Sequence, residues 1–263
     1  MMKKKRLAAM LLAVVCCLSL SACGKKSSDS DLSYIKDKGT LVVGITDFAP
    51  MDYKDDKGEW VGFDADMARE VAKALGVDVQ FVEIDWDNKI LELESKSIDC
   101  VWNGMTLTDE VKNSMSCSKP YANNAQVVVV PADKADQYQD KDSVSGLSFA
   151  VEAGSAGEAA VKDLGYQYTS VQSQADALME VAAGSSDACV IDLLMAGAMI
   201  GEGTSYPNLA HTVELTSEEY GIGFRKGSDV TDKVNEVMAD LYTKGTTAEI
   251  AKTYGVQDAM IAQ

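Results

Sequence analysis

The chain has 263 residues, of which 46% are hydrophobic, and its 41 acidic side chains outnumber its 24 Lys and Arg, for a formal net charge of −17. This length is enough for two modest domains or one large one. The acidic balance argues against a nucleic-acid partner, since such partners are held by clustered basic side chains. Net charge speaks mainly to solubility and steering, so it identifies no ligand.

The N-terminus predicts export and lipid attachment. Residues 3–6 (KKKR) are basic, and residues 7–20 form an apolar run that is short for a membrane span. This order is typical of a secretory signal. Residues 20–23 (LSAC) match the lipobox, after which Cys23 carries the lipid and becomes the mature N-terminus. An ordinary signal with a chance cysteine is the alternative.

We therefore expect residues 1–22 to be a lipoprotein signal peptide and residues 23–31 to be a flexible tether. Residues 24–31 (GKKSSDSD) contain no apolar side chain, as is typical of linkers. The predicted location is extracytoplasmic, with a lipid anchor in the cell membrane and the body in water. The signal holds four basic and no acidic residues, so its removal takes the net charge from −17 to −21.

Cysteine and histidine usage predicts no metal site and no cofactor. Cys100, Cys117 and Cys189 remain in the mature body without a CxxC motif or a Cys/His cluster. Cys100 and Cys189 lie in apolar, strand-like runs, which favours buried free thiols. A Cys100–Cys117 disulfide is the alternative. The only histidine, His211, is expected to be structural.

Strands and helices alternate along the chain. Thr40–Ile45 is an apolar strand, and residues 64–75 carry apolar side chains at helical spacing up to Gly76, a typical helix stop. Strand–helix alternation predicts an α/β architecture with mainly parallel sheets. Further strands are predicted at 77–84, 98–102, 127–130, 147–151, 188–191, 213–215 and 221–224, and further helices at 90–93, 174–183, 231–242 and 246–254.

Residues 103–111 (NGMTLTDEV) are the most informative segment. They resemble the strand-to-helix turn of the polar amino-acid binding proteins of ABC importers (solute-binding protein family 3), which usually reads S/N-G-x-T-x-T-x-E-R. Shorter matches follow the same order over about residues 38–256: residues 39–44 (GTLVVG), 61–66 (VGFDAD), 118–121 (SKPY) and 220–227 (YGIGFRKG).

This resemblance implies a two-lobed type II periplasmic-binding-protein fold with two hinge crossings, near residues 126–127 and 216–219. Lobe one would span residues 32–127 plus 217–263, and lobe two residues 128–216. Two crossings let the lobes close on a ligand by rigid rotation. The implied partners are a small-molecule ligand and a membrane permease, and the protein itself would be a monomer.

In lobe one the resemblance assigns ligand contacts to Asn103, Gly104, Met105 and Thr106, because glycine lets a ligand approach the backbone closely. Thr108 is expected to cap the helix that follows. Asp47 and Phe48 follow the first strand, where the family places an aromatic that stacks on the ligand. Trp86 would form a wall of the site, whereas Trp102 should point into the core by strand alternation. Phe48 as a lobe-packing aromatic is the alternative.

In lobe two the family's G-T/S-T/S-x-E turn corresponds to Gly154, Ser155, Ala156 and Glu158, a helix start with a capping-box pattern. Such a helix start binds anions, and in the family it donates to the ligand carboxylate. Ala156 replaces the second hydroxyl. Glu152 lies where the family's specificity residues lie, and it would face a cationic group or belong to the rim.

Asp192 ends a strand and matches the family residue that accepts the ligand's α-ammonium. A helix N-cap is its alternative role, and Asp187 before the same strand is expected to be structural.

The family Arg that grips the carboxylate is replaced by Val111, and Lys112 points about 100° away from that position. A charged hydrogen bond contributes about 1.5–3 kcal/mol, so its loss weakens binding about ten- to a hundredfold. Two readings follow. Either the helix start at 155–157 still holds a carboxylate, helped by another cation, or the ligand is an amine or cationic metabolite that Glu152, Asp192 and Asp47 favour.

Two other classes use this fold, a sensor domain and a cyclic-acid dehydratase. An enzyme needs a placed acid or base, and the sequence shows no nucleophile, metal set or cofactor loop. The sequence therefore predicts a non-enzymatic binding protein of an ABC importer.

Overall fold

The computed structural model describes residues 30–263, so the predicted signal peptide, the lipidation site Cys23 and most of the predicted tether lie outside the described residues. Helix α2 (Asp31–Lys38) begins inside the segment predicted as a tether, because Ser30 caps it and donates its hydroxyl to Asp229 Oδ2 at 2.6 Å. The folded body therefore includes Ser30 and Asp31. None of the helices within residues 30–263 has both the length and the apolarity of a membrane span.

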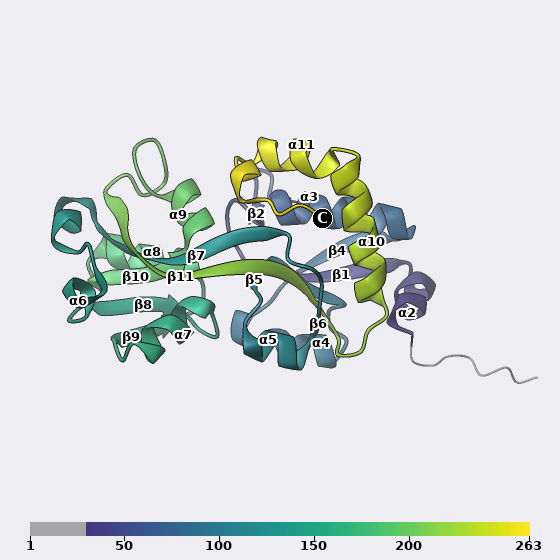
Figure 1. Cartoon of the computed structure of the whole chain (residues 1–263), viewed down its shortest axis with the longest axis horizontal. Helices are drawn as coiled ribbons and strands as arrows, with labels where there is room; N and C mark the ends of the chain where they lie inside the picture. Colours follow the sequence, from purple (N-terminus) through teal and green to yellow (C-terminus); the bar gives the residue numbers. More distant parts are fainter. Residues whose placement is uncertain (1–29) are drawn as a thin grey trace, which may run out of the picture.

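Lobe one is built around three parallel strands in the order β4-β1-β5, with β1 (Thr40–Ile45) in the middle. In Figure 1, α3 and α11 lie above these strands and α4 and α5 lie below them, whereas α10 runs from top to bottom at the right of the lobe. The other elements are β2 (Tyr53–Lys54), β3 (Trp60–Val61), α3 (Phe63–Leu75), β4 (Asp78–Glu83), η1 (Trp86–Asn88), α4 (Lys89–Glu94), β5 (Cys100–Thr106), α5 (Asp109–Ser114), β6 (Ser116–Cys117), α10 (Val230–Thr243), α11 (Thr246–Thr253) and η3 (Gln257–Ala259).

Lobe two repeats this plan with the parallel strands β10-β8-β9. The carboxyl ends of β8 and β10, at Glu152 and Asp192, lie around one cavity with the end of β5 in lobe one. Its elements are η2 (Ala132–Gln137), α6 (Lys141–Val144), β8 (Ser148–Glu152), α7 (Ala156–Asp163), β9 (Gln167–Val171), α8 (Gln174–Ala183), β10 (Ala188–Asp192) and α9 (Leu193–Met199).

Two long antiparallel strands, β7 (Ala122–Pro131) and β11 (Leu209–Phe224), run from one lobe into the other (Figure 1). They join both halves into one sheet with the order β4-β1-β5-β11-β7-β10-β8-β9, and β6 pairs with β11 beside this path. The sequence predicted two short strands at 213–215 and 221–224. The structure has one strand instead, because the polar residues between them pair with β7, where Thr216 lies opposite Gln126.

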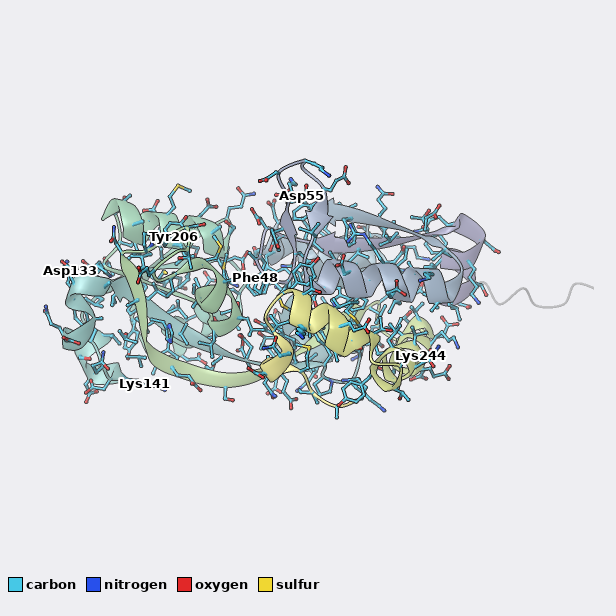
Figure 2. The ribbon with its side chains drawn as sticks, turned by 90° about the horizontal axis from the view of Figure 1, so that it is seen from above. Phe48, Asp55, Asp133, Lys141, Tyr206 and Lys244 are labelled. Atoms are coloured by element: carbon cyan, nitrogen blue, oxygen red, sulfur yellow. The ribbon has the colours of Figure 1, made fainter. Side chains whose placement is uncertain are left out.

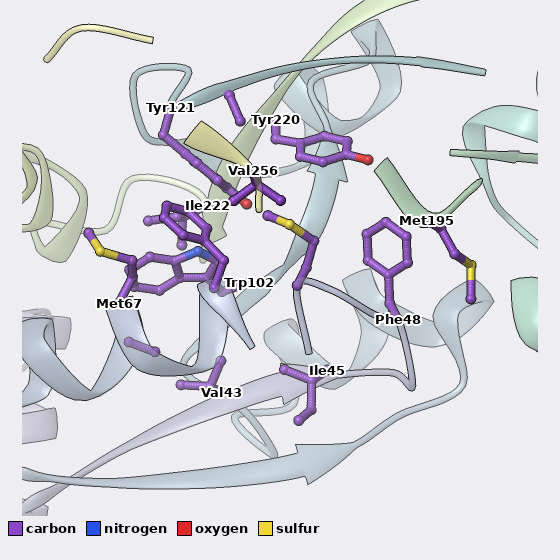
Figure 3. Packing of buried hydrophobic residues seen from close by; sticks show 14 of the residues in the cluster. Val43, Ile45, Phe48, Met67, Trp102, Tyr121, Met195, Tyr220, Ile222 and Val256 are labelled. Carbon is purple, nitrogen blue, oxygen red and sulfur yellow. The ribbon is translucent and has the colours of Figure 1, made fainter. Parts of the chain in front are cut away.

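Aromatic side chains form the core beneath the point where the long strands enter lobe one (Figure 3). Trp102 is 1% exposed and lies 6.4 Å from Tyr121, centroid to centroid, which confirms its predicted core position. Tyr121 in turn lies 6.3 Å from Tyr220. Cys100, Cys117 and Cys189 are free thiols, so the alternative disulfide is absent from the described structure.

A buried ion-pair network lies between α2, the start of β5 and the end of β11. The Arg225 guanidinium donates to Asp31 Oδ2 at 2.9 Å and to Asp99 Oδ1 at 3.2 Å. Lys38 Nζ donates to Asp99 Oδ2 at 2.6 Å. The network ties α2 to the ends of β5 and β11, so it fixes the N-terminal helix on the lobe.

We expect Arg225→Met to lower the free energy of unfolding by about 3 kcal/mol, because it removes one partner of a buried carboxylate. Urea unfolding of wild type and variant measures the difference. Lys244→Met is the matched control, since Lys244 pairs with Asp240 on the exposed surface and should unfold near the wild-type midpoint. Equal midpoints for Arg225→Met and the control would contradict the role of the network.

Candidate ligand-binding site

A cavity of about 260 Å³ lies between the lobes and draws its walls from both lobes and from β7. This volume suits a small metabolite. The predicted residues that line it are Trp86, Asn103, Gly104, Met105, Thr106, Val111, Glu152, Gly154, Ser155, Ala156 and Asp192. The remaining walls, which the sequence analysis did not assign to ligand contact, are Lys89, Ile90, Thr108, Asp109, Glu110, Gln126, Ala159 and Gln174.

The structure places Asp47 and Phe48 outside this cavity. Phe48 is 2% exposed, and its ring lies against Tyr220 at 6.4 Å between centroids. Figure 2 shows Phe48 near the middle of the long axis, and Figure 3 shows its ring between Tyr220 and Met195. Asp47 is exposed and lines a neighbouring groove with Glu83. The Phe48 ring therefore supports the site from behind, as the packing alternative expected.

The expected strand-to-helix turn at residues 103–106 is the last part of strand β5, which pairs with β11 up to Thr106. The chain turns at Leu107 and Thr108 instead. Thr108 Oγ1 accepts from Val111 N at 3.2 Å, which confirms the predicted helix cap. Pairing with β11 thus holds Met105 and Thr106, while the register shifts beside Asn103 and Gly104.

Side-chain hydrogen bonds position this strand end. Asn103 Oδ1 accepts from Thr46 N at 2.9 Å, and Asn103 Nδ2 donates to Thr46 Oγ1 at 2.7 Å. Gly104 N donates to the buried carboxyl of Asp64 at 2.7 Å. Gly104 has a φ of +56°, and a Cβ there would lie 2.3 Å from Phe48 Cε1. Both the backbone conformation and the close ring require glycine at this position.

Asp192 lies at the end of β10 among hydrogen-bond donors. Its Oδ1 accepts from Tyr220 OH at 2.6 Å, from Gln126 Nε2 at 3.0 Å, and from Asn124 Nδ2. Gln174 donates to Oδ2 and accepts from Asp192 N at 2.8 Å. Asp192 occupies the N-cap position of α9, yet its side chain makes no capping hydrogen bond there. The carboxyl therefore binds other side chains of the cavity wall and does not cap α9.

Glu218 on β11 extends this network into lobe one, and no sequence signal distinguished it from other polar hinge residues. Its Oε1 accepts from Thr106 Oγ1 at 2.9 Å, from Asn124 Nδ2 at 2.7 Å and from Gln126 Nε2 at 2.8 Å. Burial, together with the nearby Glu218 carboxylate, raises the pKa of Asp192 to about 8. The two carboxyls share amide donors, so the network links the two lobes at the hinge.

Glu152, at the end of β8, is a second buried acid in the cavity wall. It is 3% exposed, and among residues 30–263 its Oε1 has no hydrogen-bond partner. Burial raises the pKa of Glu152 to about 8, and the neighbouring Asp192 adds to the shift. A buried oxygen without a partner is costly, so Glu152 is suited to meet a donor on the ligand.

The helix start at Ser155 is formed as the sequence predicted, with one difference. Ser155 Oγ accepts from Glu158 N at 3.0 Å and caps α7. The Glu158 carboxylate accepts a hydrogen bond from Gly154 N at 2.8 Å. In a standard capping box it would accept from the N–H of the cap residue, Ser155, one position later. The first N–H groups of α7, at Ala156 and Gly157, have no acceptor within the helix and so favour an anion.

Lys89 is the cation that the sequence analysis missed, because it precedes the helix predicted from Ile90 and resembles an ordinary exposed lysine. It is 8% exposed, and its Nζ donates to Trp86 O at 3.1 Å and to Gly154 O at 2.9 Å. Burial lowers the pKa of Lys89, whereas Glu152 and other nearby acids act in the opposite direction.

Hydrogen bonds join the two lobes beside the cavity. Lys89 reaches Gly154 as described, and Gln172 Nε2 of lobe two donates to Asp85 Oδ1 of lobe one at 2.7 Å. Gly154 packs so closely on Asp87 that a Cβ would lie 2.8 Å from its Cα. Glycine at 154 thus allows the two backbones to meet.

The arrangement is that of a binding cleft between two hinged lobes, and the sequence matches a known family with this fold. Residues 41–257 match the model of the bacterial extracellular solute-binding proteins, family 3. The chain belongs to this family, whose members bind amino acids outside the cytoplasm and work with ABC transporters.

Two curated relatives cover almost the whole chain. The L-cystine-binding protein TcyA of Bacillus subtilis is 32% identical over 98% of this chain and 99% of its own length. The arginine-binding extracellular protein ArtP of the same organism is 28% identical over 93% of this chain and 96% of its own length.

Solved structures show the same fold. A substrate-binding protein of an ABC uptake transporter from Streptococcus pneumoniae, with bound histidine, has a TM-score of 0.81 and 28% identity, covering 89% of this chain and 99% of its own. The ancestral amino acid-binding protein AncCDT-1, described as a precursor of cyclohexadienyl dehydratase, has a TM-score of 0.78 and 31% identity, covering 86% and 99%.

We expect Gly104→Ala to destabilise the protein clearly more than Gly165→Ala. Both positions have positive φ, +56° and +71°, but only at Gly104 does a Cβ meet neighbouring atoms within 4 Å. Gly165→Ala should cost only the left-handed strain, about 1–2 kcal/mol. Chemical denaturation of both variants measures the difference, and equal losses would contradict the tight packing of Phe48 behind the site.

The raised pKa values of Glu152 and Asp192 predict how the ligand-free protein responds to pH. Both carboxyls are protonated in the folded state to about pH 8 and in the unfolded state only to about pH 4. The contribution of these two carboxyls to the free energy of unfolding is therefore fully present below about pH 4, and it is lost as the pH rises toward 8. The melting temperature of Glu152→Gln should fall less between pH 5 and pH 8 than that of wild type.

The matched control for this pH series is Glu94→Gln, because Glu94 is exposed at the end of α4. Its melting curve should follow wild type across the series. If the melting temperature of Glu152→Gln changes with pH as steeply as that of wild type, Glu152 does not hold its proton in the folded state.

Proposed function

We propose that the protein captures a small polar amino acid, or a related amine, in the interlobe cavity and delivers it to the membrane permease of an ABC importer. The observation that carries this proposal is the buried carboxyl of Asp192, oriented by four side chains at the wall of a cavity of about 260 Å³ between the lobes. An amino-acid ligand is supported by the relatives ArtP and TcyA, named as arginine- and cystine-binding proteins, and by the similar structure with bound histidine.

In this proposal Asp192 accepts the α-ammonium of the ligand. A ligand cation favours the ionised carboxylate, so binding brings the pKa of Asp192 back down and releases its proton. Charge-assisted hydrogen bonds of this kind are stronger than neutral ones. The strand end at Asn103, Gly104, Met105 and Thr106 provides the opposite wall, with Trp86 beside it.

The lobes that close on the ligand are proposed to be residues 32–127 plus 217–263 and residues 128–216. The crossings near 126–127 and 216–219 lie side by side in β7 and β11, which supports one shared hinge. Rotation about two adjacent strands opens the cavity without breaking either lobe.

A second candidate ligand is a cationic metabolite without a carboxylate. Val111 is 4% exposed and belongs to an apolar cluster with Trp86 and Met115, so no guanidinium stands at its position. The unpartnered Oε1 of Glu152 favours a ligand that brings a second donor.

We place the protein outside the cytoplasm as a monomeric lipoprotein held by Cys23. The basic and apolar N-terminus with residues 20–23 (LSAC) supports this anchoring. Metabolic labelling with a fatty acid, lost in Cys23→Ala, tests it.

An enzyme on the same fold is the alternative of another class. Glu152 and Asp192 hold protons near pH 8 and are chemically able to act as acids, and AncCDT-1 is described as a precursor of a dehydratase. Formation of a product from a cyclic acid by the purified protein would favour this class over transport.

The test is a thermal-shift screen of the chain from Gly24 onward against the standard amino acids and matched amines. A ligand that binds only the folded state raises the melting temperature. Asp192→Asn should weaken binding about ten- to a hundredfold, the cost of one charged hydrogen bond. Asp187→Asn is the control, since Asp187 accepts from Ser148 at the opposite end of the same strand. Equal losses in both variants would contradict the role of Asp192.

A further inference from the structure

We propose that Lys89 binds the carboxylate of the ligand in place of the missing cation at Val111, so that the substrate class is α-amino acids and not simple amines. This inference rests on the proposed function, because it assigns a second group of the same ligand.

The first support is that the Lys89 ammonium is buried without a carboxylate partner. The ion pairs among residues 30–263 do not include Lys89, although it is only 8% exposed. Its two acceptors are the carbonyls of Trp86 and Gly154, and an ammonium has three donors. A buried charge without a counter-ion is costly. The third donor is therefore available to an anion in the cavity that Lys89 lines.

The second support is that Lys89 lies beside the start of an eight-residue helix. Its Nζ is 2.9 Å from the carbonyl oxygen of Gly154, the residue before the Ser155 cap of α7. The N–H of Ala156 has no acceptor within the helix, and Ala156 lines the same cavity as Lys89. An ammonium of lobe one and a helix start of lobe two thus converge on one anion position.

The acidic side chains around Lys89 do not strongly repel an anion bound beside it. Glu158 is engaged with Gly154 N at 2.8 Å, and Asp87 and Glu110 are exposed, where solvent and salt screen them. Glu152 is buried with a pKa of about 8, so it is mainly neutral at pH 7 and does not repel a carboxylate. Asp87, Glu110 and Glu158 oppose the lowering of the Lys89 pKa by burial, and none of the ion pairs among residues 30–263 joins them to its ammonium.

A carboxylate held by Lys89 and α7 touches both lobes at once. It therefore stabilises the closed state over any open one, since a ligand shifts a conformational equilibrium by its difference in affinity. An amine without the carboxylate lacks this contact and should close the lobes less.

The experiment measures affinities by calorimetry for three matched pairs: L-arginine and agmatine, L-histidine and histamine, and L-serine and ethanolamine. Each pair differs by one carboxylate. Wild type should prefer the amino acid of a pair. Lys89→Met should weaken the amino acid about ten- to a hundredfold and leave the amine near wild type. Lys89→Arg keeps the charge and should retain most of the affinity.

Lys112→Met is the matched control, because Lys112 is exposed and its side chain lies outside the cavity wall. Circular dichroism checks that each variant is folded. Equal weakening of amino acid and amine by Lys89→Met would show that Lys89 only holds the lobes together and would overturn the inference. Wild-type preference for the amines would overturn it too. If none of the six probes binds wild type, the proposed function for these ligands fails, and the inference with it.

Discussion

The hydrogen-bond network around the buried Asp192 carboxyl is the interaction on which the rest of the site depends. Its donors come from β7, α8 and β11, and two of them, Asn124 and Gln126, also bind Glu218. Glu218 in turn accepts from Thr106 in lobe one. Because the same amides donate to both acids, the Asp192 carboxyl, which we propose to bind the ligand, is connected to the two strands that run between the lobes.

Burial makes this arrangement sensitive to charge. Two carboxyls with raised pKa values and one ammonium with a lowered pKa line a cavity of about 260 Å³. Burying a charge costs free energy, and a partner of opposite charge reduces this cost. The zwitterionic ligand that we propose offers partners for both signs. Glycines at 104 and 154 keep its walls close, one against Phe48 and one against Asp87.

Much of the fold follows from sequence pattern, because it rests on local periodicity. Thr40–Ile45 and Gln174–Ala183 have the predicted bounds, and Thr108 and Ser155 cap helices as expected. The long strand β11 was predicted as two pieces. Its middle is polar, and only pairing with β7, distant in sequence, keeps it extended. Helix α2 was not predicted, and the predicted tether ran to Asp31, since Ser30 and Asp31 are fixed by Asp229 and Arg225 far along the chain.

The sequence by itself determined the family, the two-lobed plan and most of the candidate contact residues, because short motifs at the ends of strands identify them. Only the tertiary structure decided how charge is arranged in the site. Phe48 proved to lie behind the cavity, against Gly104 and Tyr220. Lys89 and Glu218 resemble surface residues in the sequence. Lys89 becomes buried and Glu218 half-buried through contacts with segments 65 or more residues away. Such contacts depend on how the lobes meet, which no local pattern encodes.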